Sequence, residues 1–506
     1  MESRTHNTKR NILASYLLMI LQVFFSFISK SAIVFTLGKQ YLGLSGLFTS
    51  ILTVLNVAEL GFTTSIVFFM YKPIADGDVP RVCALLAYLK KVYRYVGIAI
   101  LAFGIIAGFL IPYLIHDEVP NDINIYYLYV LYLINTVISY FFAAHKTALL
   151  TAVQRLDLTK IVGCLVTIIQ YALQLIALFA FKNYYLFVVA MIVGTGFTNL
   201  FAAYISQKKF PEYVCKGEIN DEDKHEILHK VKGLLICNVS VVTYYTLDNI
   251  VISAFVGLAA VAIYGNYMTI YKAVNQLIVM IRSAMQASVG NSVAKEPIAK
   301  NLHDVFIWQF LFSVISTWCA SCMLSLYQPF MVIWMGPKML LPFSDVILIV
   351  AWFSVDIVQQ AHFLYLTAAG LWNDLRYSYI FNTCCNLILN IFLGKTLGVT
   401  GILIASLVTC VISGTFWQCI IIFREYFEVS AKKYILTQFK YFLFAVIIIG
   451  LSYYVTSIIG IDGVGGIVIK ALVCGLLSAS LIIVFYCKNP YLKDAVKLAR
   501  NATHKK

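Results

Sequence analysis

Six ionisable side chains lie inside long apolar stretches of this sequence and could carry chemistry there. They are three acids, two lysines and one histidine: Glu59, Asp248, Asp356, Lys30, Lys272 and His362. A charged side chain at a lipid-facing helix centre costs about 2.5–3.5 kcal/mol, so each group is expected to face protein or a water-filled cavity. The acids and the histidine could bind protons or sodium ions, and the lysines could bind an anion.

Each of these residues also has a purely structural interpretation. An acid and a lysine can form a buried ion pair that only locks two helices together. A lone histidine in such a helix more often packs through hydrogen bonds than carries protons, and His145, at an inner helix end, can reach the lipid headgroups. The charges come from both halves of the chain, however, which favours a shared functional role for the set.

Uncharged polar residues form stripes on two of the apolar stretches. The stripes are Asn382, Asn386 and Asn390 on one stretch and Tyr267, Tyr271 and Asn275 on another. Residues that recur every four positions share one helix face. Such a face can hold neighbouring helices together by hydrogen bonds or can line a wet cavity, and the sequence leaves both interpretations open.

The stretches that position these residues are transmembrane helices. Of the 506 residues, 61% are hydrophobic and 12% are charged, about half the charged share of a soluble protein. Apolar runs long enough to cross a bilayer recur along the whole chain. We expect fourteen spans, at 11–37, 44–71, 95–115, 125–145, 161–181, 184–205, 233–256, 258–281, 306–328, 344–369, 377–396, 399–423, 440–460 and 465–487. The sequence therefore predicts an all-α polytopic membrane protein.

The positive charges are divided unequally between the two sides that these spans define. The side that holds both termini carries 31 of the 38 lysines and arginines, and the opposite side carries five. Because positive residues collect in cytoplasmic segments, both termini are expected in the cytoplasm. The net charge of +14 is then a topology signal with some attraction to anionic membrane lipids, and no nucleic-acid partner is implied.

A pair of glycine-framed turns indicates an internal repeat. Gly38 and Gly46 frame the first turn between spans, Gly257 and Gly265 frame the seventh, and the offset is 219 residues. Six spans separate the turns, so the two halves should share one topology. The expected domains are an N-terminal six-helix lobe at 1–206, a cytoplasmic linker at 207–232, a C-terminal six-helix lobe at 233–423, and two extra helices with a basic cytoplasmic tail at 424–506.

Two of the cytoplasmic segments have helical patterns of their own. The linker is expected to hold a short solvated helix between Pro211 and Gly233. In the tail, Leu492, Val496 and Ala499 recur at helical spacing, and we expect this face to lie along the inner membrane surface.

No catalytic or cofactor motif is found in the sequence. There is no P-loop or other glycine-rich nucleotide site, so transport would not be driven by ATP hydrolysis on this chain. The 12 cysteines are scattered, and Cys319 and Cys322 have redox-motif spacing but lie in the middle of an apolar run. The chain is therefore expected to be no enzyme and to use no cofactor or metal.

Three segments carry a resemblance to a known family. They are the stretch from Leu37 to Asp78 with the following YLKKVYR, the stretch LDNIVISAFVGLAAVAIYGNYMTI from Leu247, and the asparagine stripe followed by GKTLGVTGILIAS. In these segments the chain resembles Wzx-type polysaccharide biosynthesis proteins, the oligosaccharide flippases of the MOP (MATE-like) exporter superfamily. The resemblance extends over essentially the whole chain.

This resemblance implies two six-helix lobes in a V around a central cavity, with two additional C-terminal helices. It implies a flippase that moves polyprenyl-diphosphate-linked oligosaccharide repeat units across the bacterial cytoplasmic (inner) membrane by alternating access. The product would serve capsule, O-antigen (lipopolysaccharide) or exopolysaccharide synthesis. A polysaccharide polymerase and glycosyltransferases would be functional partners, and protons or sodium ions would be the coupling ions.

The resemblance also suggests roles for the intramembrane residues, assigned by role rather than by a strict motif. The cations that bind the substrate diphosphate would be Lys30, Lys272 and Arg282. The coupling or gating residues would be Glu59, Asp248, Asp356 and His362. The polar cavity lining would be Asn275, Asn382, Asn386 and Asn390.

Two other functions stay open at the level of sequence. A MATE-type cation-coupled drug antiporter has the same fold, but such proteins usually have twelve spans, and fourteen spans favour the flippase. A membrane glycosyltransferase or polymerase usually needs a large external loop or an acidic metal motif, and the sequence has neither.

Overall fold

The computed structural model of the protein describes residues 4–116, 119–141 and 144–497, and every regular element in these ranges is a helix. Packing divides the chain into two units, Met1–Ala262 and Ile263–Lys506, and each is described by itself. The all-α fold predicted from the sequence is confirmed in the described part of the chain.

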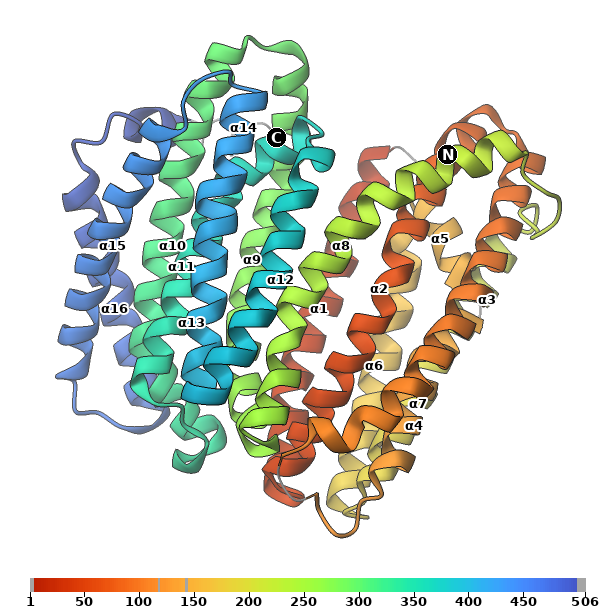
Figure 1. The fold of residues 1–506 in the computed structure, drawn as a ribbon, viewed down its shortest axis with the longest axis horizontal. Helices are drawn as coiled ribbons and strands as arrows, with labels where there is room; N and C mark the ends of the chain where they lie inside the picture. Colours follow the sequence, from red (N-terminus) through yellow and green to blue (C-terminus); the bar gives the residue numbers. More distant parts are fainter. Residues whose placement is uncertain (1–3, 117–118, 142–143, 498–506) are drawn as a thin grey trace. The chain divides into compact units, whose positions relative to one another are not determined.

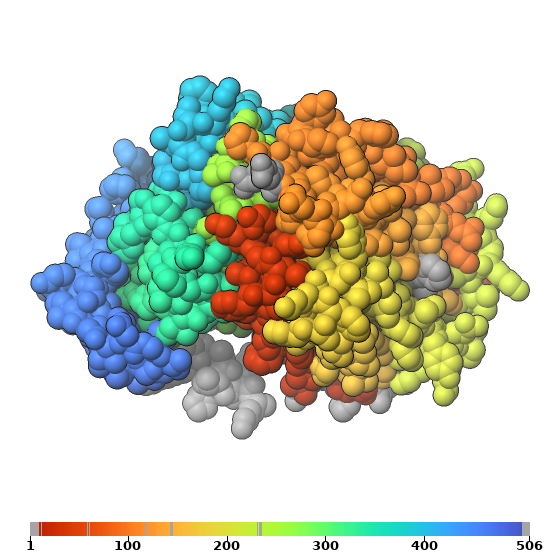
Figure 2. All heavy atoms as spheres, turned by 90° about the horizontal axis from the view of Figure 1, so that it is seen from below, coloured from red at the N-terminus to blue at the C-terminus, as the bar shows by residue number. Residues whose placement is uncertain are grey.

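The first unit is built around α2. Its elements are α1 (Arg4–Thr36), α2 (Lys39–Asp76), α3 (Val79–Leu110), η1 (Ile111–Leu114), α4 (Ile125–Phe141), α5 (Ala144–Ala152), α6 (Leu156–Phe179), α7 (Tyr184–Lys209) and α8 (Asp221–Phe255). α2 packs along α8, α1 along α6, and α6 along α7 (Figure 1). Gly61 permits the close approach of α2 to α8, because a Cβ there would lie 3.3 Å from Val231. At one end of the unit, Figure 2 shows the α6–α7 turn (yellow) beside the α1–α2 turn (red).

The second unit is built around α10. Its elements are α9 (Leu258–Lys295), which joins this unit from Ile263 onward, and α10 (Ile298–Met335), η2 (Pro337–Met339), α11 (Phe343–Ala368), α12 (Trp372–Leu397), α13 (Val399–Cys410), η3 (Val411–Gln418), α14 (Cys419–Glu425), α15 (Lys432–Ser457) and α16 (Gly463–Tyr486). α10 packs against α11, α15 and α16, and Figure 2 shows the α10–α11 turn beside the α15–α16 turn. α13, η3 and α14 follow one another without a break and form one span, Val399–Glu425.

The helices are numerous and apolar enough for a multi-pass membrane protein. Among the described residues, twelve helices could cross a membrane by length and composition, or thirteen if α4 and α5 form one bent span. α9 corresponds to the expected span at 258–281 but is not among the twelve, because polar and charged residues recur along it. Where fourteen spans are expected, the described residues thus hold twelve or thirteen candidate spans, and one of the expected spans falls on the polar helix α9.

α2 and α9 begin in the same way, as the predicted internal repeat requires. Each helix has 38 residues and begins one residue after a glycine with positive φ, which is 114° at Gly38 and 120° at Gly257. Each glycine N–H donates to the carbonyl five residues earlier, at 3.0 Å for Ile33 and 2.9 Å for Ile252. A residue with a Cβ would be strained in this conformation, so the two glycines set the direction of the repeated helices.

The starts of α2 and α9 touch at Gly43. A Cβ at this position would lie 2.1 Å from the carbonyl oxygen of Leu258, the first residue of α9. Small residues permit such an approach of two helix backbones, and here only glycine fits. The contact lies inside the first unit, to which the first turn of α9 belongs.

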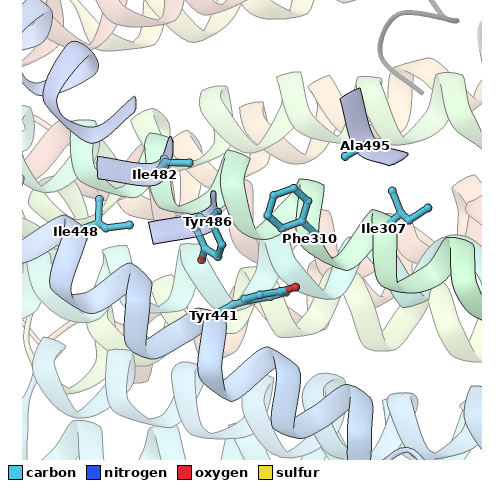
Figure 3. Packing of buried hydrophobic residues seen from close by; sticks show 7 residues of the cluster. All are labelled: Ile307, Phe310, Tyr441, Ile448, Ile482, Tyr486 and Ala495. Atoms are coloured by element: carbon cyan, nitrogen blue, oxygen red, sulfur yellow. The ribbon is translucent and has the colours of Figure 1, made fainter. Parts of the chain in front are cut away.

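The last two helices, α15 and α16, pack on α10 through aromatic rings (Figure 3). Phe310 of α10, Tyr441 of α15 and Tyr486 of α16 are at most 4% exposed. The Tyr486 ring meets the other two edge-on, with centroids 5.4 Å from Phe310 and 5.5 Å from Tyr441. Such ring pairs add about 0.5–1.5 kcal/mol each beyond the burial of area. α15 and α16 are therefore an integral part of the second unit.

The helix expected inside the linker is not a separate element. α8 runs without a break from Asp221 to Phe255. Asn220 caps it, and its side chain accepts a hydrogen bond from the Asp223 N–H at 2.8 Å. The cap and the acidic first turn favour a helix start at this point, and the helix then continues directly into the seventh span.

The tail after α16 folds onto α10. Tyr491 stacks on Phe306 of α10 with ring centroids 5.7 Å apart, and Ala495 is 3% exposed. Val496 is 45% exposed, and Ala499 lies outside the described residues. The aromatic contact, which periodicity did not reveal, fixes the tail on the second unit.

Candidate functional site

Glu59 of α2 lies in a hydrogen-bonded group that we name the first cluster: Asn56, Glu59, Thr63, Tyr93 and Tyr140. Tyr140 of α4 donates to Glu59 Oε2 at 2.7 Å, and Thr63 donates to Oε1 at 3.3 Å. The Tyr140 hydroxyl also lies 3.2 Å from Asn56 Oδ1, and Thr63 Oγ1 lies 2.7 Å from the hydroxyl of Tyr93 on α3. Three helices therefore converge on one partly buried carboxylate.

The spacing of α2 and a glycine of α3 position this cluster. Asn56, Glu59 and Thr63 are three and four residues apart and share one helix face. Gly97 of α3 lets α4 approach, because a Cβ there would lie 3.0 Å from the Tyr140 Cβ. Tyr93 and Tyr140 are 2% and 6% exposed. Sequence reasoning missed both, since nothing in the pattern separates them from the other tyrosines, 33 in all.

Asp356 of α11 forms the second cluster with Tyr271 and Asn275 of α9. The Tyr271 hydroxyl and the Asn275 amide both donate to Asp356 Oδ2 at 2.9 Å. The Tyr271 ring packs against Trp352 and Phe353, with centroids 5.2 Å and 5.6 Å away. Asp356 is 7% exposed, so this carboxylate is more deeply buried than Glu59.

The two clusters occupy equivalent places in the repeat. Asn275 follows Asn56 by 219 residues, the same offset that separates the starts of α9 and α2. Each asparagine hydrogen-bonds within its cluster. The carboxylate lies on the repeated helix in the first cluster and on a neighbouring helix in the second. The stripe of Tyr271 and Asn275 thus holds an acid in place.

Asp248 and His362 are both buried. Asp248 of α8 is 1% exposed, and the amide of the adjacent Asn249 donates to Ser50 of α2 at 2.9 Å. His362 of α11 has no exposed surface, and its ring meets the Tyr434 ring of α15 edge-on at 5.9 Å. Full burial and a ring contact fit the packing interpretation of this histidine.

The three cations expected to bind a diphosphate lie on α1 and α9. Lys30 of α1 is partly buried, and Lys272 of α9 is exposed. Adjacent helical residues point about 100° apart, so Lys272 and the buried Tyr271 face different sides of α9. The Arg282 guanidinium lies over the Phe363 ring of α11, 4.7 Å from its centroid. This cation–π contact holds the guanidinium in a defined position.

The asparagine stripe of α12 joins two helices. Asn386 donates to Ser406 and Thr409 of α13 at 3.3 Å each, and Asn390 donates to Asn386 at 3.0 Å. Neither asparagine has exposed surface. These two asparagines therefore form hydrogen bonds between α12 and α13, which is one of the two interpretations that the sequence leaves open. Asn382, at the other end of the stripe, is only partly buried.

A buried ion-pair group that sequence reasoning missed joins α1 to the start of α6. Asp157 is 1% exposed and accepts from Arg10 at 2.6 Å and from Arg155 at 3.0 Å. Its backbone N–H donates to Asn11 Oδ1 at 2.7 Å. The two arginines served only as topology signals in the sequence, because no local spacing links residues 147 positions apart. The group fixes one end of the helix that carries Lys30.

Each cluster could exchange a proton or bind a small cation. A carboxylate held by neutral donors in a poorly hydrated site can accept a proton, and the tyrosine hydroxyls can rotate to accept from the protonated acid. Their oxygens are also the ligand type that hard cations prefer. Over the described ranges, no group of three or more His, Cys, Asp or Glu side chains could hold a metal ion.

Solved structures establish the fold of this chain. An inward-facing multidrug resistance MATE family transporter of the MOP superfamily aligns with a TM-score of 0.65 and 14% identity, over 85% of this chain and 99% of its own. The lipid II flippase MurJ, inward closed, aligns with a TM-score of 0.64 and 12% identity, over 94% of this chain and 98% of its own. The eukaryotic MATE transporter AtDTX14 aligns with a TM-score of 0.57 and 12% identity, over 86% and 99%.

No protein-family model and no curated protein sequence matches this chain. Identities of 12–14% establish the fold alone. The chain therefore has the fold shared by MATE transporters and the MurJ flippase, and it is a multi-pass membrane protein.

Proposed function

We propose that this chain is a flippase for polyprenyl-diphosphate-linked oligosaccharide repeat units in a bacterial cytoplasmic membrane. It would belong to the Wzx-type branch of the MOP exporter superfamily and work by alternating access. Glycosyltransferases would supply its substrate, and a polysaccharide polymerase would use the units it delivers. Its product would enter capsule, O-antigen or exopolysaccharide synthesis.

The observation that carries this proposal is the extent of the shared fold. The lipid II flippase aligns with 94% of this chain. The MATE transporter aligns with 85% of this chain, and that alignment already includes 99% of the transporter's own length. The chain is thus longer than this MATE structure, and its last two helices are bound into the second unit by the rings around Tyr486. A protein named for flipping a lipid is therefore the fuller match.

In this proposal the substrate diphosphate binds the intramembrane cations. Arg282 would present its planar donors to phosphate oxygens, and the Phe363 ring beneath it favours one orientation. Lys30 and Lys272 would add point charges. The glycan would lie in a hydrated space lined by polar residues such as Asn382, while the polyprenyl chain stays in lipid.

The two carboxylate clusters would couple turnover to protons or sodium ions. Neutralising Glu59 or Asp356 removes a charge from the membrane interior. The free energy needed to move the helix that carries this residue past lipid is then lower. A charge that crosses the membrane potential contributes about 2.3 kcal/mol per 100 mV. Asp248 would act in gating, and His362 would act through its packing against α15.

Transport by the full chain in proteoliposomes tests the proposal. The substrate is a polyprenyl-diphosphate oligosaccharide with a fluorescent sugar, and a membrane-impermeant quencher reports the leaflet. We expect Lys30→Glu and Lys272→Glu each to slow transport at least about tenfold, the effect of about 1.4 kcal/mol of lost binding. Lys338→Glu, on η2, is the matched control and should transport normally. Normal transport by both test variants would show that the diphosphate role is wrong.

A cation-coupled drug antiporter is the second candidate function. The MATE transporter aligns with a TM-score of 0.65 and the flippase with 0.64. The fold is thus as similar to that of an antiporter as to that of a flippase, which favours this second candidate. The same proteoliposomes loaded with ethidium separate the two candidates. Ethidium efflux without movement of the lipid-linked sugar contradicts the flippase, and polymer formed from lipid-linked units would establish a polymerase instead.

A further inference from the structure

The span Val399–Glu425 contains a π-helical segment. This segment, η3, covers Val411–Gln418 and lies between α13 and α14. In a π-helix each N–H pairs with the carbonyl five residues earlier instead of four, so the backbone accommodates an extra residue. Such segments are rare and are frequent at functional sites. Such a segment can also change to α-helical hydrogen bonding, and this change shifts the register of all residues that follow it in the helix.

Gln359 of α11 inserts its side-chain amide into η3. Its Nε2 donates to the Cys410 carbonyl oxygen at 3.0 Å and to Thr415 Oγ1 at 3.1 Å. Gly414 leaves the room for this amide, because a Cβ there would lie 2.0 Å from Gln359 Oε1. The amide therefore bonds to the carbonyl directly before the π-helical segment and to a side chain within it.

η3 also forms one wall of a cavity of about 230 Å³ in the second unit. The cavity opens to the surface, where Phe416 and Phe439 of its lining are 45% and 60% exposed. Thr415 and Phe416 lie in this wall, and α10, α11 and α15 form the others. α14 follows η3 directly, and the short loop at 426–431 then leads into α15. Two walls of the cavity therefore depend on the register of η3.

We propose that η3 is a register switch that Gln359 holds in its π-helical state. In the other state the segment is α-helical, and each residue of α14 takes the place now held by the residue after it. This movement is a turn of about 100° with a shift of about 1.5 Å. Thr415 and Phe416 then leave their present places in the cavity wall. The switch does not depend on the proposed substrate.

Both states of the switch have a continuous hydrogen-bonded backbone. The α-helical state loses the bonds that the Gln359 amide makes to Cys410 and Thr415. It also moves Phe423, which is 1% exposed and packs on Tyr434 with ring centroids 5.0 Å apart, to the exposed place of Arg424. The π-helical state is therefore the more populated one, and a bound molecule shifts the two states in proportion to its preference for one. A molecule that enters the cavity meets Thr415 only in the π-helical state, so it would favour that state.

Cys419, the first residue of α14, reports the register. It has no exposed surface, whereas the next residue, Ile420, is 46% exposed. In the α-helical state Cys419 takes the place of Ile420 and becomes accessible to a thiol reagent. Cys487 is exposed and serves as an internal reference for the reagent.

The test is alkylation of the full chain in detergent by N-ethylmaleimide, followed for each cysteine by mass spectrometry. Gln359→Ala should speed alkylation of Cys419 at least about two- to tenfold relative to Cys487, the range expected for the loss of only one of the two neutral hydrogen bonds that the amide donates. Gln360→Ala is the matched control, because the Gln360 amide donates to a carbonyl of its own helix, that of Asp356, at 3.1 Å. The control should leave the rate unchanged.

Gly414→Ala tests the switch by a second route. Its Cβ displaces the Gln359 amide and should speed alkylation of Cys419 as well, whereas Gly450→Ala meets no atom within 4 Å and should not. An unchanged rate in both Gln359→Ala and Gly414→Ala overturns the proposal, as does an equal rise in Gln360→Ala. If Gln359→Ala does not fold, Gln359→Asn keeps the amide but shortens its reach, and the same outcomes apply to it.

Discussion

Each half of the repeat surrounds one carboxylate with hydroxyl and amide groups, but the two halves place it on different helices. In the first cluster Glu59 lies on α2, and its tyrosine partner lies on α4. In the second cluster Asp356 lies on α11, and its partners lie on α9, the counterpart of α2. The repeat thus preserves the place of the polar group but not the helix that carries its charge.

The two carboxylates also differ in what supports them. Asp356 is 7% exposed and accepts two donors on one oxygen. Glu59 is only partly buried, and its donor Tyr140 has a second acceptor in Asn56. Loss of the acid should therefore lower the free energy of unfolding more in the second cluster than in the first. Three comparisons test this difference, from the largest expected effect to the smallest.

Removal of each carboxylate should have the largest effect. Asp356→Ala takes away the acceptor that the Tyr271 hydroxyl and the Asn275 amide share, and should lower the free energy of unfolding by about 2–6 kcal/mol, or about 1–3 kcal/mol for each donor. Glu59→Ala also removes the acceptor of two donors, but Tyr140 keeps Asn56 and Thr63 keeps the Tyr93 hydroxyl, so it should cost only about 1–3 kcal/mol. Thermal unfolding of both variants in one detergent gives the comparison, and equal losses would contradict the difference drawn here.

The two equivalent asparagines should show a smaller difference. Asn275→Ala removes a donor to a carboxylate, and bonds to charged groups contribute about 1.5–3 kcal/mol. Asn56→Ala removes an acceptor from a neutral tyrosine hydroxyl, which contributes about 0.5–1.5 kcal/mol. The same unfolding measurement applies. A cost for Asn275→Ala as small as that for Asn56→Ala would indicate that Asp356 is protonated.

Isosteric neutralisation should have the smallest effect on stability and should separate coupling from packing. Glu59→Gln and Asp356→Asn keep the shape and an acceptor oxygen, so each should change the free energy of unfolding by about 1 kcal/mol or less. The variant that neutralises a coupling acid should lose the pH dependence of transport in proteoliposomes. Unaltered export and pH dependence in Glu59→Gln would leave Glu59 with a structural role only.

The helices and the repeat could be predicted from the sequence because both depend on local, regular signals. Runs of apolar residues mark the spans, and each additional residue adds to the same signal. The glycine offset places the start of α9 at the correct residue, because Gly38 and Gly257 adopt a backbone conformation that other residues avoid. Signals of this kind need no knowledge of which helices are neighbours.

The partners of the acids could not be predicted, because they depend on packing between distant segments. Tyr140 is 81 residues from Glu59, and spacing gives no reason to pair them. The stripe of Asn386 and Asn390 showed that they share a face, but not that this face meets α13. The π-helical segment depends on Gln359, at least 51 residues away, and its own sequence, VISGTFWQ, has no proline to mark an interruption.

The backbone contact at Gly43 also bears on how the two copies of the repeat could diverge under selection. At Gly43 the carbonyl of Leu258 excludes every side chain. The residue at the same place in α9 is Ala262, so the second copy holds a methyl group there. Gly265, the counterpart of Gly46, has nothing within 4 Å of its would-be Cβ. Among descendants of this chain, Gly43 should therefore be retained, whereas Gly265 should be free to change to other residues. The sequence similarity between the two copies should then be lost first through changes in the second copy.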